Sequence, residues 1–338
     1  MLRLPRSPIS ALLAAVLLVA ALAGFAGCGD DATSEAGDTA TTADAPTIVV
    51  TTSVLGSLVT ELVGDRAEVQ VLMPNGVDPH DFQPSAKDAS RLQDADLIVM
   101  NGLELEESLE KPVEQAGAAG VPVFVAGDHV DVRVFGEGEL PEDEHADEEH
   151  ADEKQAGTED EHAHEHGSGA DDPHIWMDPA QMQKVVAALT PVVQQETGLD
   201  VAAAGKDLQG RLAALSTELA ERAATVPAAN RKLVTGHESM GYFARAYDFE
   251  LVGAIIPSLS SQAEPSAGEL AELREQIRAA KVPAIFTEIG TPTSIAEAIG
   301  DETGVRVIEV ASHNLPDDGS YLTFMREVMD RVVDGLGS

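Results

Sequence analysis

The stretch TIVVTTSVLGSLVTELVGDRAEVQVLM, residues 47–73, carries two kinds of pattern in one short run. Its two ends, TIVVTT (47–52) and AEVQVLM (67–73), are short and rich in β-branched residues, which predicts buried strands. Between them VLGSLVTELVG (54–64) spaces its apolar residues as an amphipathic helix does. A strand, a helix and a second strand in succession predict a parallel pair with the helix packed across it.

The same alternation continues on both sides of a long helical region. Before that region we expect a helix over 85–95 with Ser85 as its N-cap, and strands over 96–101 and 121–126. The helical region comprises 178–198 and a second helix, uninterrupted from about 201 to 225, that would span about 35 Å at 1.5 Å per residue. After it we expect a last helix near 320–336 and, with helices between them, the strands 231–236, 250–257, 283–288 and 305–310.

The fold class predicted from this order is α/β, with two small lobes that contain parallel sheets, a long helix that joins them and a ligand cleft between them. The expected N-terminal lobe covers 47–199 and contains a disordered insert at 136–172. The bridging helix covers 200–226, and the C-terminal lobe covers 229–338.

The first 46 residues have the composition of an export segment and a tether. Arg3 and Arg6 precede the apolar run ISALLAAVLLVAALAGFAG, which is typical of a signal peptide over 1–27. A retained membrane-spanning helix is the alternative, although the run is near the lower length limit. Cys28 is the only cysteine, so no intramolecular disulfide forms, and the polar residues after it are typical of a disordered tether.

The insert at 136–172 carries much of the formal net charge of −38. Its alternating acids and histidines cannot bury apolar surface, and so strong a negative charge excludes nucleic acid as a partner because the phosphates would be repelled. A solubilising segment is the simplest interpretation. Histidine-rich tracts are also typical of metal capture, and we expect that role for five histidines: His145, His150, His162, His164 and His166.

Four other histidines stand in distinctive surroundings. His80 and His174 each follow Asp-Pro, and prolines near them restrict the backbone as the rigid placement of a metal ligand requires. Like His80, His237 and His313 come just after predicted strands, at the sheet edge where ligands bind in α/β folds. His129 lacks such surroundings, and we expect it on the surface.

Neutral imidazoles that converge from separate loops suit Zn²⁺, whereas Mg²⁺ and Ca²⁺ prefer oxygen ligands. Nearby carboxylates then become candidates for a supporting role, in which they accept the second ring N–H of a ligand. These candidates are Asp78, Asp172 and Glu288.

Taken in order, DPHDFQP (78–84), DPHIWMDP (172–179) and GHESMGYF (236–243), with the acidic histidine-rich segment and the lipobox-like FAGC, resemble a known family. It is the family of solute-binding lipoproteins of bacterial zinc and manganese ABC importers, the ZnuA/TroA-like group. The resemblance implies a metal held between two bridged lobes by one histidine from each motif, which maps onto His80, His174 and His237. It also implies a monomer that is lipidated at Cys28, anchored outside the bacterial cell membrane and served by an ABC permease.

The fourth ligand is where this chain departs from the family pattern. The family usually has an aspartate after the last strand, whereas this loop reads VASHNLPDDG (310–319). His313 is our favoured fourth ligand, and Asp317 and Asp318 are the alternatives in a shifted register. Glu288 matches a family acid and is either a supporting residue or an alternate ligand.

Zinc is the expected cargo, because family members specialised for manganese tend to have glutamate where His237 stands. A manganese or ferrous iron carrier is the first alternative, and a metal-dependent adhesin is another. A zinc hydrolase with Glu238 as general base is a third alternative, but no HExxH motif is present. We therefore expect a binding protein and no enzyme.

Overall fold

The computed structural model describes residues 45–136, 169–288 and 290–337. The signal peptide, Cys28, most of the tether and the five histidines of the insert, all expected from the sequence, lie outside these residues. Within the described part of the chain, no helix is long and apolar enough to cross a membrane.

The first lobe is a four-stranded parallel sheet with helices packed on it. The strand order is β2–β1–β3–β4, with β1 (Thr47–Thr52) paired to β2 (Glu68–Met73) and to β3 (Leu97–Met100), and β4 (Val123–Val125) at the edge. Four consecutive residues of β1, Ile48 to Thr51, are fully buried, as expected where both faces of a parallel sheet are covered. The predicted parallel sheet is therefore confirmed.

Helices connect these strands. α1 (Ser53–Val63) follows β1, and α2 (Ala86–Gln93) begins after Ser85, whose side chain caps it as predicted. α3 (Glu107–Ala118) was not predicted, because Pro112 lies inside it and proline usually ends a helical pattern.

The second lobe contains two parallel strand pairs that lie side by side. β5 (Lys232–His237) pairs with β6 (Glu250–Ile256), β7 (Ala284–Thr287) pairs with β8 (Arg306–Glu309), and β5 packs beside β7. The helices of this lobe are α6 (Gly241–Tyr247), α7 (Ala267–Ala280), α8 (Thr293–Thr303) and α9 (Tyr321–Leu336).

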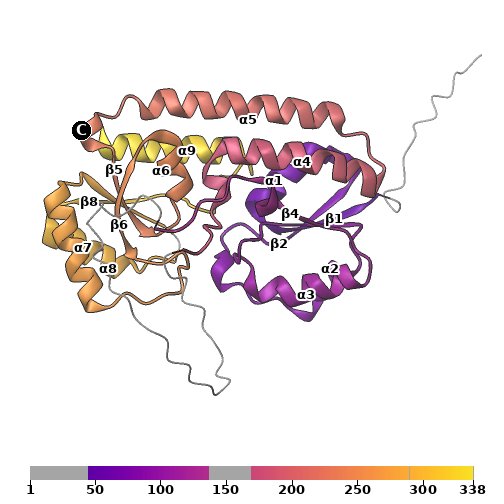
Figure 1. The fold of residues 1–338 in the computed structure, drawn as a ribbon, viewed down its shortest axis with the longest axis horizontal. Coiled ribbons are helices and arrows are strands. Elements are labelled where there is room, and N and C mark those ends of the chain that lie inside the picture. Colours follow the sequence, from indigo (N-terminus) through magenta and orange to yellow (C-terminus); the bar gives the residue numbers. More distant parts are fainter. Residues whose placement is uncertain (1–44, 137–168, 289, 338) are drawn as a thin grey trace, which may run out of the picture. The chain divides into compact units, whose positions relative to one another are not determined.

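Two long helices, α4 (Pro179–Thr197) and α5 (Ala202–Ala223), lie between the lobes in the sequence. α5 packs on α4, on α1 of the first lobe and on α6 and α9 of the second, so it runs along both lobes (Figure 1). An ion pair joins α5 to each lobe. Arg211 contacts Glu61 of α1 at 2.6 Å, and Glu218 contacts Arg326 of α9 at 2.7 Å.

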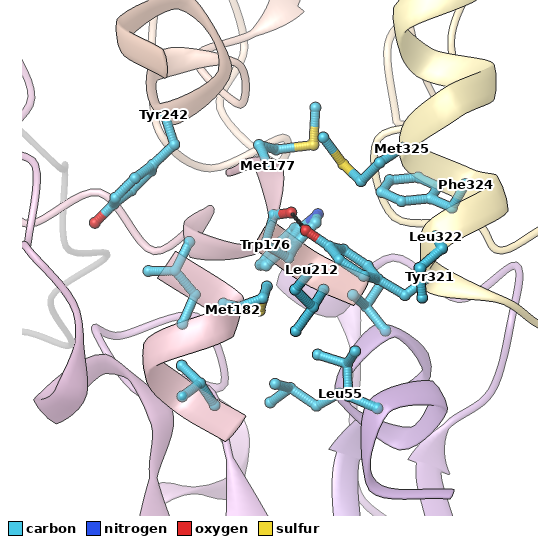
Figure 2. Packing of buried hydrophobic residues seen from close by; sticks show 14 of the residues in the cluster. Leu55, Trp176, Met177, Met182, Leu212, Tyr242, Tyr321, Leu322, Phe324 and Met325 are labelled. Atoms are coloured by element: carbon cyan, nitrogen blue, oxygen red, sulfur yellow. Dashed lines mark hydrogen bonds between the residues drawn. The ribbon is translucent and has the colours of Figure 1, made fainter. Parts of the chain in front are cut away.

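One apolar cluster extends across both lobes around Trp176 (Figure 2). The Tyr321 hydroxyl at the start of α9 donates to the carbonyl of Trp176 at 2.7 Å. The indole N–H of Trp176 donates to the carbonyl of Ser312 at 2.6 Å, in the loop after β8. The segment around Trp176 is thus tied to the second lobe by hydrogen bonds as well as by packing.

The two ends of the insert pair with each other. Phe135 N–H donates to the carbonyl of Ala170 at 2.8 Å, and Asp172 N–H donates to that of Arg133 at 2.7 Å. Val134 and Asp171 form an antiparallel bridge between these contacts. The predicted disordered range 136–172 was therefore too wide, since 169–172 is held by backbone hydrogen bonds that composition does not reveal.

Candidate metal centre

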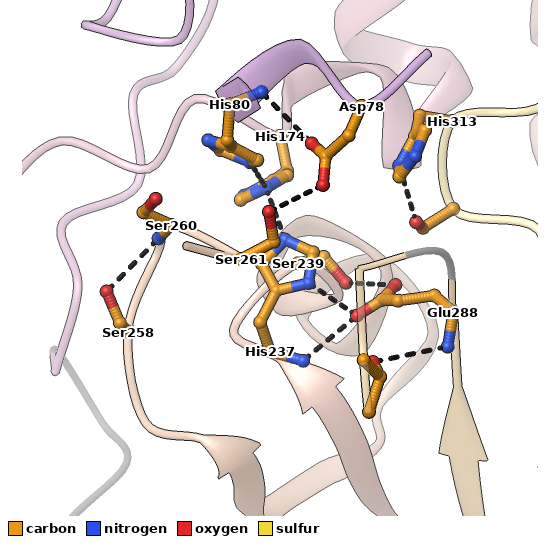
Figure 3. A network of polar contacts seen from close by, with 12 residues as sticks. Asp78, His80, His174, His237, Ser239, Ser258, Ser260, Ser261, Glu288 and His313 are labelled. Atoms are coloured by element: carbon orange, nitrogen blue, oxygen red, sulfur yellow. Dashed lines mark hydrogen bonds and ion pairs between the residues drawn. The ribbon is translucent and has the colours of Figure 1, made fainter. Parts of the chain in front are cut away.

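Three histidines from distant parts of the sequence meet at one point between the lobes (Figure 3). His80 lies in a short 3₁₀ turn (Pro79–Asp81), His174 precedes another (Ile175–Met177), and His237 is the last residue of β5. The Nε2 atom of His174 lies 3.3 Å from that of His80 and 3.2 Å from that of His237. One nitrogen from each ring belongs to a group whose members all lie within 4.8 Å of one another.

The ring of His174 is fixed by a buried carboxylate. Oδ1 of Asp172 accepts the backbone N–H of His174 at 3.0 Å and lies 2.8 Å from its Nδ1. Arg133 donates to the other carboxylate oxygen at 3.0 Å. Because the carboxylate takes a proton donor at Nδ1, this contact assigns the lone pair to Nε2, which faces the other two histidines.

The ring of His237 has a matching support from Glu288, the residue after β7. Oε1 of Glu288 accepts the backbone N–H of His237 at 3.0 Å and lies 2.7 Å from its Nδ1. Ser239 donates to Oε2 at 2.7 Å. Two of the three rings therefore have the carboxylate–histidine arrangement that orients metal ligands.

The pKa values of these groups move in different directions. Burial lowers the pKa of His174, and Asp172 only partly opposes this. Burial also disfavours the charged form of His237, but the charge of Glu288 outweighs burial and raises the pKa of His237. Burial would raise the pKa of Glu288 itself, yet the contacts with His237 lower it to about 2.

Asp78 supports His80 through the backbone. Its Oδ1 accepts the N–H of His80 at 3.0 Å, and its Oδ2 accepts the hydroxyl of Ser261 from the second lobe at 2.6 Å. These contacts reach the backbone of His80, and the expectation that Asp78 accepts a ring N–H stays a prediction.

His313 is buried near the three histidines but outside the 4.8 Å group. Its Nδ1 lies 2.9 Å from the hydroxyl of Ser312. Its Nε2 is buried and has no hydrogen-bond partner in the described part of the chain. Such a nitrogen requires an explanation, because an unpaired buried polar atom is costly.

The two alternative aspartates lie elsewhere. Asp317 and Asp318 are both exposed. Asp318 accepts the N–H of Ser320 at 3.0 Å and the hydroxyl of Thr323 at 2.7 Å, at the start of α9. The structure therefore does not bring either carboxylate to the three histidines, and the register shift that would make them ligands finds no support.

Two further predictions concern residues outside the cluster. His129 is exposed and stacks on Phe124 with ring centroids 4.8 Å apart, so its expected surface position is confirmed. Glu238, the candidate general base, is 8% exposed, and burial raises its pKa to about 7. Its backbone N–H donates to the carbonyl oxygen of Ser258.

A family model described as the periplasmic zinc-uptake complex component A, ZnuA, matches residues 48–335, nearly the whole described chain. The chain belongs to this family. It is 30% identical over 331 residues to the high-affinity zinc uptake system protein ZnuA of Bacillus subtilis, covering 96% of this chain and 95% of that one. It is 28% identical over 330 residues to the manganese-binding lipoprotein MntA of Halalkalibacterium halodurans, covering 95% and 96%.

The solved structure of the periplasmic zinc-binding protein TroA from Treponema pallidum matches with a TM-score of 0.70 at 25% identity, covering 87% of this chain and 100% of that one. The ZnuA family and the two-lobe α/β fold predicted from the sequence are thereby confirmed. In this ZnuA family member, the predicted ligands His80, His174 and His237 lie together, and Asp172 and Glu288 contact two of them as predicted.

Sequence reasoning missed some residues of the site. Arg133 binds Asp172, and the side-chain amide of Asn101 donates to the carbonyl of Pro173 at 2.9 Å, just before His174. Asn101 follows a strand, and that position was its only available signal. Ser239 and Ser261 are small and common residues whose contacts depend on the tertiary fold.

Proposed function

We propose that this chain captures Zn²⁺ outside the cell membrane and delivers it to the permease of an ABC importer. The observation that carries this proposal is the convergence of three histidine Nε2 atoms, two of them on rings whose Nδ1 contacts a carboxylate. This is the arrangement that holds a metal and sets its affinity. In this function the ion is the cargo.

The donor chemistry favours zinc over manganese. Neutral imidazole nitrogens suit Zn²⁺, whereas carboxylate and carbonyl oxygens suit Mn²⁺. The relatives include two proteins named for zinc and several named for manganese, so their names support metal capture without choosing the ion. The charge of the dication is offset by carboxylates that contact the ligands rather than the metal: Asp78, Asp172 and Glu288.

His313 completes the proposed shell as fourth ligand. A buried Nε2 without a hydrogen-bond partner supports this role, because a metal would supply the missing partner. Four protein nitrogens would fill a tetrahedral Zn²⁺ site and leave no position for water. A catalytic site needs such an open position, so the same shell argues for a carrier and against a zinc hydrolase.

Lipidation of Cys28 would hold the carrier at the membrane surface. The sequence around Cys28 carries this part of the proposal, and several relatives are named as lipoproteins. Cys28→Ser should release the processed protein from the membrane fraction, because the lipid supplies the attachment. Retention of the processed variant in that fraction would contradict the anchor.

Elemental analysis of protein purified without added metal tests the cargo directly. We expect close to one tightly held zinc per chain, and we expect Zn²⁺ to displace Mn²⁺ in a competitive titration against a chromophoric chelator. Retention of manganese or iron against an equal concentration of zinc would assign a different cargo. Absence of tight binding for all three ions would contradict metal capture altogether.

A further inference from the structure

Two charged side chains of the first lobe, Arg133 and Asp78, lie close to glycines of the second lobe. A Cβ atom added to Gly241 would lie 2.7 Å from Nε of Arg133 and closer still to its Cζ and Nη1. A Cβ added to Gly290 would lie 2.8 Å from Oδ2 of Asp78. These separations are shorter than van der Waals contact, so each glycine provides space that a larger residue would fill.

Arg133 is held in its place from several directions. The residue is 6% exposed, and its Nη1 donates to Asp172 at 3.0 Å. Its backbone N–H donates to the hydroxyl of Tyr242, the residue after Gly241 in α6, at 3.0 Å. The guanidinium therefore cannot yield to a Cβ at Gly241 without disturbing its contact with Asp172.

Asp78 lies against Gly290, the second of these glycines. It accepts a hydrogen bond from Ser261 of the second lobe, and the site close-up shows its carboxylate directed at that hydroxyl (Figure 3). Its other oxygen accepts the backbone N–H of His80. The anion thus joins a loop of the second lobe to the turn that carries His80.

Each of these side chains is connected to a proposed ligand of the first lobe, Asp78 directly and Arg133 through Asp172. Arg133 binds Asp172, which binds both the backbone and the ring of His174. Asp78 binds the backbone of His80. The third histidine, His237, belongs to the second lobe, so the distances among the three depend on how the lobes meet.

We propose that Arg133 and Asp78 are positioning residues, which set His174 and His80 against His237 by fitting into the spaces at Gly241 and Gly290. This inference rests on the proposed metal-binding function. Neither side chain touches the metal in this role. They act on affinity because they fix where the first-lobe ligands stand relative to the second lobe.

Gly241→Ala tests the position of Arg133 without altering a ligand. Gly241 begins α6 and has no positive φ, so alanine suits its backbone and the main cost is displacement of the guanidinium. We expect the Kd for Zn²⁺ to rise about 10- to 100-fold, as for loss of a residue that supports a ligand. The matched control is Gly210→Ala in α5, where no atom lies within 4 Å of the added Cβ, and the Kd should not change.

A double-mutant cycle separates this mechanism from general damage. If Gly241→Ala acts through Arg133, it should add nothing to the Kd of Arg133→Ala, because the displaced group is already absent. Because Arg133→Ala leaves the buried Asp172 carboxylate without its cation and so lowers stability, the deciding readout is the visible spectrum of bound Co²⁺, which should change in both single variants. Independent effects that multiply in the double variant would overturn the role of Arg133.

Ser261→Ala tests Asp78 in the same way and keeps the proposal testable if the arginine variants fail to fold. We expect a smaller rise in Kd, up to about 10-fold, because one hydrogen bond is lost and the space at Gly290 remains. A Kd equal to wild type in both Gly241→Ala and Ser261→Ala would overturn the proposal. A wild-type chain that binds no metal would instead refute the proposed function, so the two failures are distinguishable.

Discussion

The two carboxylate–histidine pairs of the site share a geometry but differ in charge balance. In both pairs one carboxylate oxygen contacts the histidine Nδ1 and accepts the backbone N–H of the same residue. The second oxygen of Asp172 faces the cation Arg133, whereas that of Glu288 faces the neutral hydroxyl of Ser239. Asp172 therefore shares its charge between two partners, and Glu288 directs its charge at His237.

The pKa values of the two rings also shift in opposite directions. Burial prevails at His174, which favours the neutral, metal-binding form. At His237 burial acts in the same direction, but Glu288 prevails and favours the protonated form. The comparison teaches that similar ligand supports can divide two tasks, since His174 favours its neutral, metal-binding form and protons compete more strongly at His237 than at His174.

Removal of a ligand ring should have the largest effect on zinc affinity, and loss of His174 or His237 leaves only one carboxylate–histidine pair. His174→Ala and His237→Ala should each weaken zinc binding by more than about 100-fold, and His80→Ala should do the same, since each change removes a donor atom rather than its support. Isothermal or chelator-competition titration at about pH 8 measures the effect. Near wild-type affinity in any one variant would remove that histidine from the shell.

His313 extends the comparison to a ring with no carboxylate at Nδ1. His313→Ala should weaken zinc binding by about 10- to 100-fold if its unpaired Nε2 joins the shell. Asp317→Ala and Asp318→Ala are the matched controls from the same loop, and both should bind zinc like the wild type. The opposite result would assign the fourth donor to an aspartate and refute the all-histidine shell.

Substitution of each carboxylate tests the comparison through the pH dependence of zinc binding. Asp172→Asn and Glu288→Gln should each weaken binding about 10- to 100-fold at pH 8, because each ring loses its charged support. Only Glu288→Gln should change the onset of proton competition. Without the charge of Glu288, burial is opposed only by the smaller effects of Asp78 and Glu238, so the pKa of His237 falls and the Kd should begin to rise at a lower pH than in wild type.

Titrations between about pH 5.5 and 8 locate this onset for each variant. In the wild type it should lie above the ordinary histidine value of about 6.5, because the pKa of His237 is raised. Asp172→Asn should leave the onset where it is, since the pKa of His174 is already lowered. Equal movement of the onset in both carboxylate variants would contradict the division of tasks.

Deletion of residues 137–168 should have the smallest effect on the tight site. The segments that flank the deletion already pair through Phe135 and Ala170, and Arg133 and Asp172 lie on the retained side of that pairing. We expect an unchanged Kd for one zinc and the loss of additional weak equivalents. Loss of the tight site would show that the insert contributes to the carboxylate–histidine pairs.

The sequence predicts the local elements of this fold better than the relations between them. The strand predicted at 47–52 has those bounds, because a run of β-branched residues between a proline and a helix leaves little choice. α3 was missed because Pro112 interrupts its pattern. The position of α5 along both lobes depends on packing against α1 and α9, which periodicity alone does not report.

The residues of the site likewise divide into those that a local motif predicts and those that only the tertiary fold brings there. His80, His174 and His237 could be found because each lies in a short motif, and Asp172 and Glu288 because they stand near such a motif or at a strand end. Arg133 could not, since its contact with Asp172 spans 39 residues and depends on the pairing of the two ends of the insert. The orphaned Nε2 of His313 is likewise a product of tertiary burial.

The only tryptophan of the chain makes the site optically visible. The ring centroid of Trp176 lies 5.3 Å from that of His174, and the indole N–H is committed to a carbonyl of the opposite lobe. Indole emission responds to a neighbouring charge and to changes in its hydrogen bond. Excitation of this single fluorophore therefore reports ion capture, ring protonation and lobe displacement in unlabelled protein, without interference from any other indole.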